Sequence, residues 1–163
     1  MCPCLRLFAS ERISSRFWTR NDRASGDAYL ASSVLLRVIL VQRNALKEWQ
    51  SIERRVVSAL VEVECLRTLD RVRLAEGFDD ADVAARREAV YRLIEAMEIV
   101  ELTGPVLSRA SQPLPTSLGT LDALHLATAL LWREQTAADL VMATHDEALA
   151  RASRASGLRV IGV

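Results

Sequence analysis

Acidic side chains at separate places in the chain have the type and setting of a metal-dependent hydrolytic site. Asp122 falls in the first turn of an expected helix, where the positive end of the helix dipole keeps a carboxylate ionised. Asp146 follows an expected strand, and Glu62 and Glu64 lie near the start of another expected helix. Simple complementation of the helix dipole is the alternative explanation of Asp122 taken alone.

Carboxylates that converge without a cation repel one another. Two of them about 4 Å apart cost roughly 4 kcal/mol at an effective dielectric near 20. Such clusters therefore occur chiefly where a divalent cation binds, and oxygen ligands without a His/Cys set suit Mg²⁺ or Mn²⁺ better than zinc. A site of this kind performs phosphate-ester chemistry, in which the metal activates water and neutralises charge in the transition state.

Alternating short apolar runs and amphipathic segments must position these carboxylates. Strands are expected near residues 27–30, 55–58, 99–102, 140–143 and 158–161, and helices near 34–40, 43–52, 59–73, 81–97, 103–110, 118–131 and 148–156. Ser32 or Ser33 is the expected N-cap of the first helix, and Thr120 that of the helix carrying Asp122. The alternation predicts an α/β fold with a parallel, buried sheet and helices on both faces.

Ligands of such sheets bind beyond the C-terminal ends of the strands. The residues expected there are Ala31, Ser32, Thr144 and Asp146. Glu62 and Glu64 are two positions apart, about 200° around a helix axis, so only one of them can face a given site.

The length and amino-acid composition exclude several classes of protein. At 163 residues a single domain is expected, and the 21 basic side chains balance the 21 acidic ones, so there is no global attraction to nucleic acid. No apolar run is long enough for a membrane span. Cys2, Cys4 and Cys65 make neither an even disulfide framework nor a zinc-ligand set, which indicates a reduced, cytoplasmic protein with Cys65 in the core.

Residues 1–26 form a basic N-terminal extension without clear periodicity. It holds five arginines against Glu11 and Asp22. Its composition mimics a transit peptide. Translation from an upstream start codon or a poorly packed basic arm explains it better, and a role in holding RNA stays open.

Four blocks carry a resemblance to the PIN domain family, in particular to its VapC-like toxins. They are Tyr-Leu-x-Ser-Ser-Val-Leu-Leu-Arg at 29–37, Ser-x₅-Glu-x-x-Arg at 58–67, Leu-Asp-Ala-Leu-His-Leu-Ala-Thr-Ala at 121–129 and Ala-Thr-His-Asp at 143–146. The third block is the most specific. The resemblance implies a PIN-like domain over residues 27–163, with a three-layer α/β/α fold around a mostly parallel sheet. It also implies an Mg²⁺-dependent (or Mn²⁺-dependent) endoribonuclease toxin, usually a homodimer, whose antitoxin blocks the site.

The resemblance also assigns site residues. Glu64, Asp122 and Asp146 match the family's acidic metal ligands, and Arg67 favours Glu64 over Glu62 because it completes the family's Glu-x-x-Arg. Ser32 and Thr144 match polar residues that form hydrogen bonds near the metal.

One position departs from the family pattern. The family's first aspartate, a direct metal ligand, is replaced here by Ala31. Asp27 cannot substitute for it, because it lies roughly 13 Å away along a strand at about 3.3 Å per residue. Metal binding and RNA cleavage are therefore expected to be impaired. The alanine is either an engineered inactivating change or a natural feature of a degenerate nuclease.

Three further candidate site residues each have two possible roles. His125 either approaches the substrate or is a satisfied helix histidine, and Arg37 and Arg67 are either ion-pair partners of the acidic cluster or phosphate clamps. Two functions follow for the whole chain: a metal-dependent ribonuclease toxin impaired at position 31, or a non-catalytic PIN-like module that binds an antitoxin or RNA.

Overall fold

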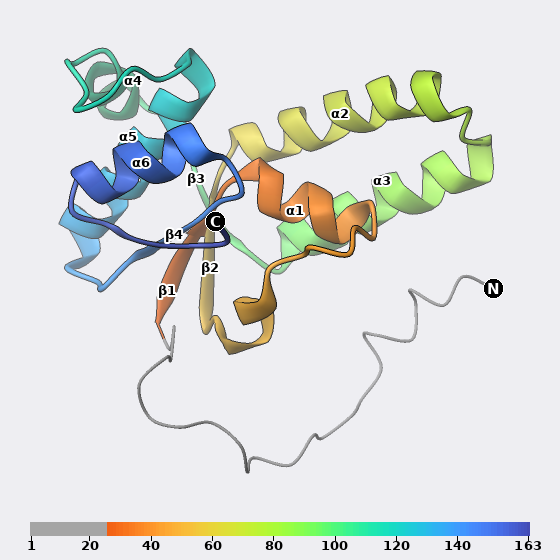
Figure 1. Cartoon of the computed structure of the whole chain (residues 1–163), viewed down its shortest axis with the longest axis horizontal. Helices are drawn as coiled ribbons and strands as arrows, with labels where there is room; N and C mark the ends of the chain where they lie inside the picture. Colours follow the sequence, from red (N-terminus) through yellow and green to blue (C-terminus); the bar gives the residue numbers. More distant parts are fainter. Residues whose placement is uncertain (1–25) are drawn as a thin grey trace, which may run out of the picture.

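A parallel five-stranded sheet forms the centre of the fold (Figure 1). The computed structural model describes residues 26–163. The strands are β1 (Asp27–Leu30), β2 (Arg54–Ser58), β3 (Glu98–Val100), β4 (Val141–Ala143) and β5 (Arg159–Ile161). The helices are α1 (Ser32–Ile39), α2 (Leu60–Glu76), α3 (Asp80–Glu95), α4 (Gly104–Ala110), α5 (Thr120–Thr136) and α6 (Glu147–Ala155), with a 3₁₀ turn η2 (Lys47–Ser51).

The strand order β3-β2-β1-β4-β5 places β1 in the middle of the sheet. Tyr29 in β1 pairs with Val56 of β2 on one side and with Met142 of β4 on the other. The chain winds outward from β1 to β3 and then returns to the other side of β1 as β4. This reversal creates a crevice beyond the C-terminal ends of β1 and β4, where sheets of this type bind ligands.

Alternate residues of the strands face two separate helical layers. Ala28, Leu30 and Val57 belong to the core cluster that also contains residues of α1, α2 and α3. Tyr29 and Met142 belong to the opposite cluster, which includes residues of α5 and α6. This period of two along each strand gives the three-layer α/β/α architecture, which confirms the predicted fold class.

Helices α2 and α3 form a long hairpin on one side of the sheet (Figure 1). Its turn contains Gly77, which is left-handed at φ 65°, and Asp79, whose carboxylate accepts from the amide of Asp82 as the N-cap of α3. The far ends of both helices extend beyond the sheet (Figure 1). The start of α2, in contrast, lies directly after β2.

Three local predictions were wrong. The helix expected over 43–52 is only η2, because buried Leu46 and Ile52 anchor both ends and leave room for a single turn. The N-cap of α1 is Ala31, without a side-chain cap, and not Ser32 or Ser33. The N-cap of α5 is Gly119, whose carbonyl accepts the amide of Ala123, so Thr120 is already helical.

The structure also tests the predicted burial of Cys65 and the predicted lack of a membrane-spanning segment. Cys65 is buried in the core, as predicted, whereas Cys2 and Cys4 lie outside the described residues, as does nearly all of the proposed extension 1–26. Within residues 26–163, no helix combines the length and apolar character needed to cross a membrane.

Candidate active site

The candidate site lies where β1 and β4 end side by side. The amide of Ala31, the residue after β1, donates at 3.0 Å to the carbonyl of Ala143, the last residue of β4. Ala31 is 3% exposed, and Thr144, the next residue after β4, is fully buried. A side chain at position 31 therefore starts from the interior, at the edge of the crevice.

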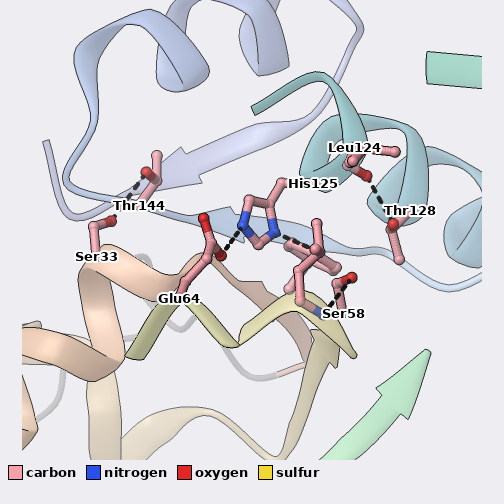
Figure 2. Close-up of polar contacts among 9 residues, drawn as sticks. Ser33, Ser58, Glu64, Leu124, His125, Thr128 and Thr144 are labelled. Atoms are coloured by element: carbon pink, nitrogen blue, oxygen red, sulfur yellow. Dashed lines mark hydrogen bonds and ion pairs between the residues drawn. The ribbon is translucent and has the colours of Figure 1, made fainter. Parts of the chain in front are cut away.

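Hydroxyl groups organise the loop that follows β4. The Thr144 hydroxyl accepts the amide of Asp146 at 3.0 Å, and the Ser33 hydroxyl accepts the amide of His145 at 3.1 Å. The two hydroxyl oxygens are 3.5 Å apart, and the dashed line between Ser33 and Thr144 in Figure 2 marks this contact. The supporting role of Thr144 near a metal stays a prediction. The serine bonded to this loop is Ser33 and not the predicted Ser32, and both serines line a neighbouring pocket.

Asp146 begins helix α6. Its Oδ1 accepts the amide of Leu149 at 2.8 Å, which makes it the N-cap, and the residue is exposed. Because a carboxylate has two oxygens, this cap leaves the second one available to a ligand.

Asp122 lies in the first turn of α5 and is half-buried. Burial raises the pKa of its carboxyl, the nearby carboxylates of Asp146 and Glu64 raise it further, and His125 opposes them. Glu64, Asp122 and Asp146 therefore share one electrostatic environment, although they are far apart in the sequence.

The donor chemistry of these carboxylates fits Mg²⁺ or Mn²⁺, but the set of ligands is incomplete. Within residues 26–163, no three acidic, histidine or cysteine side chains are arranged closely enough to hold a metal ion. Ala31 supplies no oxygen at the point where the two strands end.

Glu64 and Glu62 point to different parts of the surface. Glu64 lines a pocket of about 470 Å³ beside the site, whereas Glu62 lines a separate, smaller hollow with Ile99 and Glu101. This is the outcome expected for residues about 200° apart around a helix axis. Glu64 therefore faces the pocket formed by α1, α2 and the start of α5, and Glu62 does not.

The pocket is mostly apolar, with a polar rim. Its apolar lining comes from α1, α2 and the start of α5, namely Leu36, Leu60, Val63 and Leu121. Arg67 is exposed at its edge, and the Arg37 guanidinium donates to the carbonyl of Asn44 at 3.1 Å. In the described part of the chain, neither arginine lies within 4.0 Å of a carboxylate, so the ion-pair interpretation finds no support.

His125 is inside the protein, not on a surface that a substrate could contact. It is 1% exposed, and its Nδ1 and Nε2 atoms lie 2.8 Å from the Tyr29 hydroxyl and 2.7 Å from Glu64 Oε2. Figure 2 shows the imidazole of His125 directed at the carboxylate of Glu64. Sequence reasoning missed Tyr29 and Ser33. The only signal for Tyr29 was that a phenol in a buried strand needs a hydrogen-bond partner.

Asp122→Asn is expected to stabilise the metal-free protein at neutral pH. A raised pKa in the folded state means that the ionised form of Asp122 costs stability, fully so at a pH above that raised pKa. The cost vanishes below the pKa of the unfolded chain, about 3.9. Urea unfolding in EDTA between pH 3.5 and 7 should show the advantage of the variant growing with pH.

The matched control is Asp80→Asn, which removes a carboxylate from the first turn of α3, where the side chain is 96% exposed. A pH-independent difference between Asp122→Asn and the unmodified chain would contradict the shared environment of the three carboxylates.

Comparison with known proteins places this site in a family. The PIN domain family model matches residues 28–155. The chain is 31% identical over 137 residues to ribonuclease VapC46 of Mycobacterium tuberculosis, covering 82% of this chain and 95% of that protein.

Solved structures share the fold at low sequence identity. VapBC2 from Rickettsia felis, in a crystal structure with a DNA fragment from its promoter, has a TM-score of 0.58 at 11% identity over 82% of this chain and 96% of that one. PAE2754 from Pyrobaculum aerophilum has a TM-score of 0.56 at 18% identity, covering 83% and 84%. A toxin–antitoxin complex from Klebsiella pneumoniae has a TM-score of 0.52 at 16% identity, covering 77% and 89%. From the family match and the identity to VapC46 together, the chain belongs to the PIN domain family.

Proposed function

We propose that this chain is a metal-dependent endoribonuclease of a toxin–antitoxin pair, with its activity lowered by Ala31. The proposal rests on Asp122, whose pKa is raised by burial and by the carboxylates of Asp146 and Glu64, and on the adjacent ends of β1 and β4, where the amide of Ala31 donates to the carbonyl of Ala143. A cluster that raises the pKa of its own member is destabilised without a cation and stabilised with one. The 31% identity to ribonuclease VapC46 supports RNA as the substrate.

Glu64, Asp122 and Asp146 would hold Mg²⁺ or Mn²⁺. When bound, the ion supplies a water of lowered pKa and neutralises charge on the phosphate. The Thr144 hydroxyl fixes the amide of Asp146, and the Ser33 hydroxyl fixes that of His145, so the loop carrying Asp146 is held in one conformation. Two arginines would contact phosphates of the RNA strand: Arg67, on α2 at the pocket edge, and Arg37, on α1.

The same pocket suits an antitoxin segment. Its apolar lining from α1, α2 and α5 can receive apolar side chains, and Arg67 and Glu64 at its rim can pair with charges of the partner. Two of the similar structures are toxin–antitoxin complexes, which supports a protein partner of this kind. We further propose a homodimer in the cytoplasm, as expected from the family resemblance.

Ala31→Asp is the direct test of the nuclease. The added ligand should raise the rate of Mn²⁺-dependent cleavage of structured RNA by about 100-fold, because a properly held metal contributes several kcal/mol to transition-state stabilisation. Asp122→Asn in the same background should abolish the gain. Ala31→Asn, which adds the same volume without a charge, is the control.

The alternative is a non-catalytic PIN-like module that binds an antitoxin or RNA. The observation in its favour is the incomplete ligand set around buried Ala31. If the Ala31→Asp variant stays inert at high concentration with Mn²⁺ and yet binds RNA or antitoxin, this alternative replaces the nuclease.

A further inference from the structure

A buried chain of hydrogen bonds links the central strand to the acidic site. The Tyr29 hydroxyl, on β1, is 2.8 Å from His125 Nδ1, and His125 Nε2, on α5, is 2.7 Å from Glu64 Oε2, on α2. Tyr29 is 0% exposed and His125 1% exposed. These hydrogen bonds thus lead from the interior of the sheet to the edge of the pocket. They include two buried polar side chains, Tyr29 and His125, that the proposed reaction does not use.

The chemistry of the carboxylate fixes the direction of the bond between His125 and Glu64. An ionised carboxylate only accepts, so the Nε2–H of His125 donates to Glu64. In the neutral ring Nδ1 accepts from the Tyr29 hydroxyl, and in the charged ring Nδ1–H donates to the Tyr29 oxygen, so the bond to Glu64 is the same in both. An unpaired phenol or imidazole at this depth would be costly, and here each of the two satisfies the other.

Glu64 is the member of this hydrogen-bond network that reaches solvent. Its side chain is 17% exposed, against 2% for the side chain of His125, and it lines the pocket. Figure 2 shows Oε2 directed at the imidazole, with the other carboxylate oxygen turned away from the ring. One oxygen is therefore held by the core while its neighbour stays free to bind a ligand.

We propose that His125 and Tyr29 are positioning residues for Glu64: they hold one of its oxygens so that the other faces the acidic site in a fixed orientation. The inference rests on the proposed function, in which Glu64 is a ligand of Mg²⁺ or Mn²⁺. A free glutamate on α2 would sample several rotamers, and the bond to His125 selects one of them before any ligand arrives.

The test compares variants of the full-length chain carrying Ala31→Asp, with Mn²⁺ affinity measured by calorimetry. His125→Leu removes the donor and should weaken Mn²⁺ binding by about 10-fold or more, the usual effect of losing a group that orients a metal ligand. His125→Gln should retain most of the affinity, because its amide nitrogen reaches the place of Nε2. Tyr29→Phe keeps the aromatic ring and should fall between the two.

Leu126→Ala is the matched control. Leu126 is the next residue of α5, is fully buried and packs in the cluster on the far side of the sheet from α1–α3. Its truncation should lower Tm without changing Mn²⁺ affinity. Equal affinities for the leucine and glutamine variants of His125, in protein that binds Mn²⁺, would refute the positioning role and leave the proposed function intact.

A second measurement needs no metal. ¹H–¹⁵N NMR of the imidazole should show a slowly exchanging proton on Nε2, and Glu64→Gln should shift the signal of that proton. A proton on Nδ1 alone would overturn the proposal. A normal imidazole signature in protein that binds no Mn²⁺ with either residue at position 31 would instead refute the proposed function, and with it the role of Glu64 as a positioned ligand.

Discussion

Ala31→Asp is expected to destabilise the metal-free protein by about 3 kcal/mol and to make its stability depend on Mn²⁺. The new carboxylate starts from a position that is 3% exposed, where β1 ends beside β4, and under the proposed function it faces the carboxylates of Glu64, Asp122 and Asp146. Repulsion between two carboxylates about 4 Å apart is worth roughly 4 kcal/mol at an effective dielectric of 20. Mn²⁺ at about 100 times its Kd should return roughly 2.7 kcal/mol.

Urea unfolding with EDTA and with Mn²⁺ measures both effects. Ala31→Asn is the control for side-chain volume: it should lose less stability than the aspartate variant and gain nothing from Mn²⁺. If the two variants behave alike under both conditions, position 31 does not face the carboxylates of Glu64, Asp122 and Asp146.

Gly162→Ala is expected to lower the free energy of unfolding by about 3 kcal/mol, through backbone strain and overpacking. Gly162 follows β5 at φ 98°, and a Cβ built there would lie 2.5 Å from the carbonyl oxygen of Thr144. That oxygen belongs to backbone that cannot move without disturbing the bond between the Thr144 amide and the Ile161 carbonyl. The variant should therefore also displace the loop that carries Asp146.

Gly77→Ala separates the two causes of this loss. Gly77 is left-handed at φ 65°, but a Cβ there meets no atom within 4 Å, so only the conformational cost of about 1 kcal/mol should remain. Equal losses at the two glycines in chemical denaturation would show that the contact with Thr144 is unimportant.

The strands and helices could be predicted from local patterns because their signals are local. Buried runs such as Leu140–Ala143 and amphipathic stretches such as the one carrying Asp122 indicate their own secondary structure. The helical period also established that Glu62 and Glu64 face different ways. The parallel α/β class then followed from the alternation of the segments.

Side-chain partners were harder to predict, because they depend on how distant segments approach. Nothing within a few residues of His125 indicates Tyr29 or Glu64 as its partners, since the three lie on different elements. The choice between Ser32 and Ser33 depended on where α1 begins, and a one-residue difference rotates the side chain by about 100°. The strand order, likewise, follows from packing of the whole chain.

The hairpin of α2 and α3 suggests a practical use. Its base carries Glu64, whereas its tip, at Gly77, extends past the sheet and has open space around it (Figure 1). Exposed turns of this type tolerate insertions well. A fluorophore or a fused carrier domain attached there would stand clear of both the acidic cluster and the pocket, so that binding of RNA or of a partner protein could be followed on an immobilised sample.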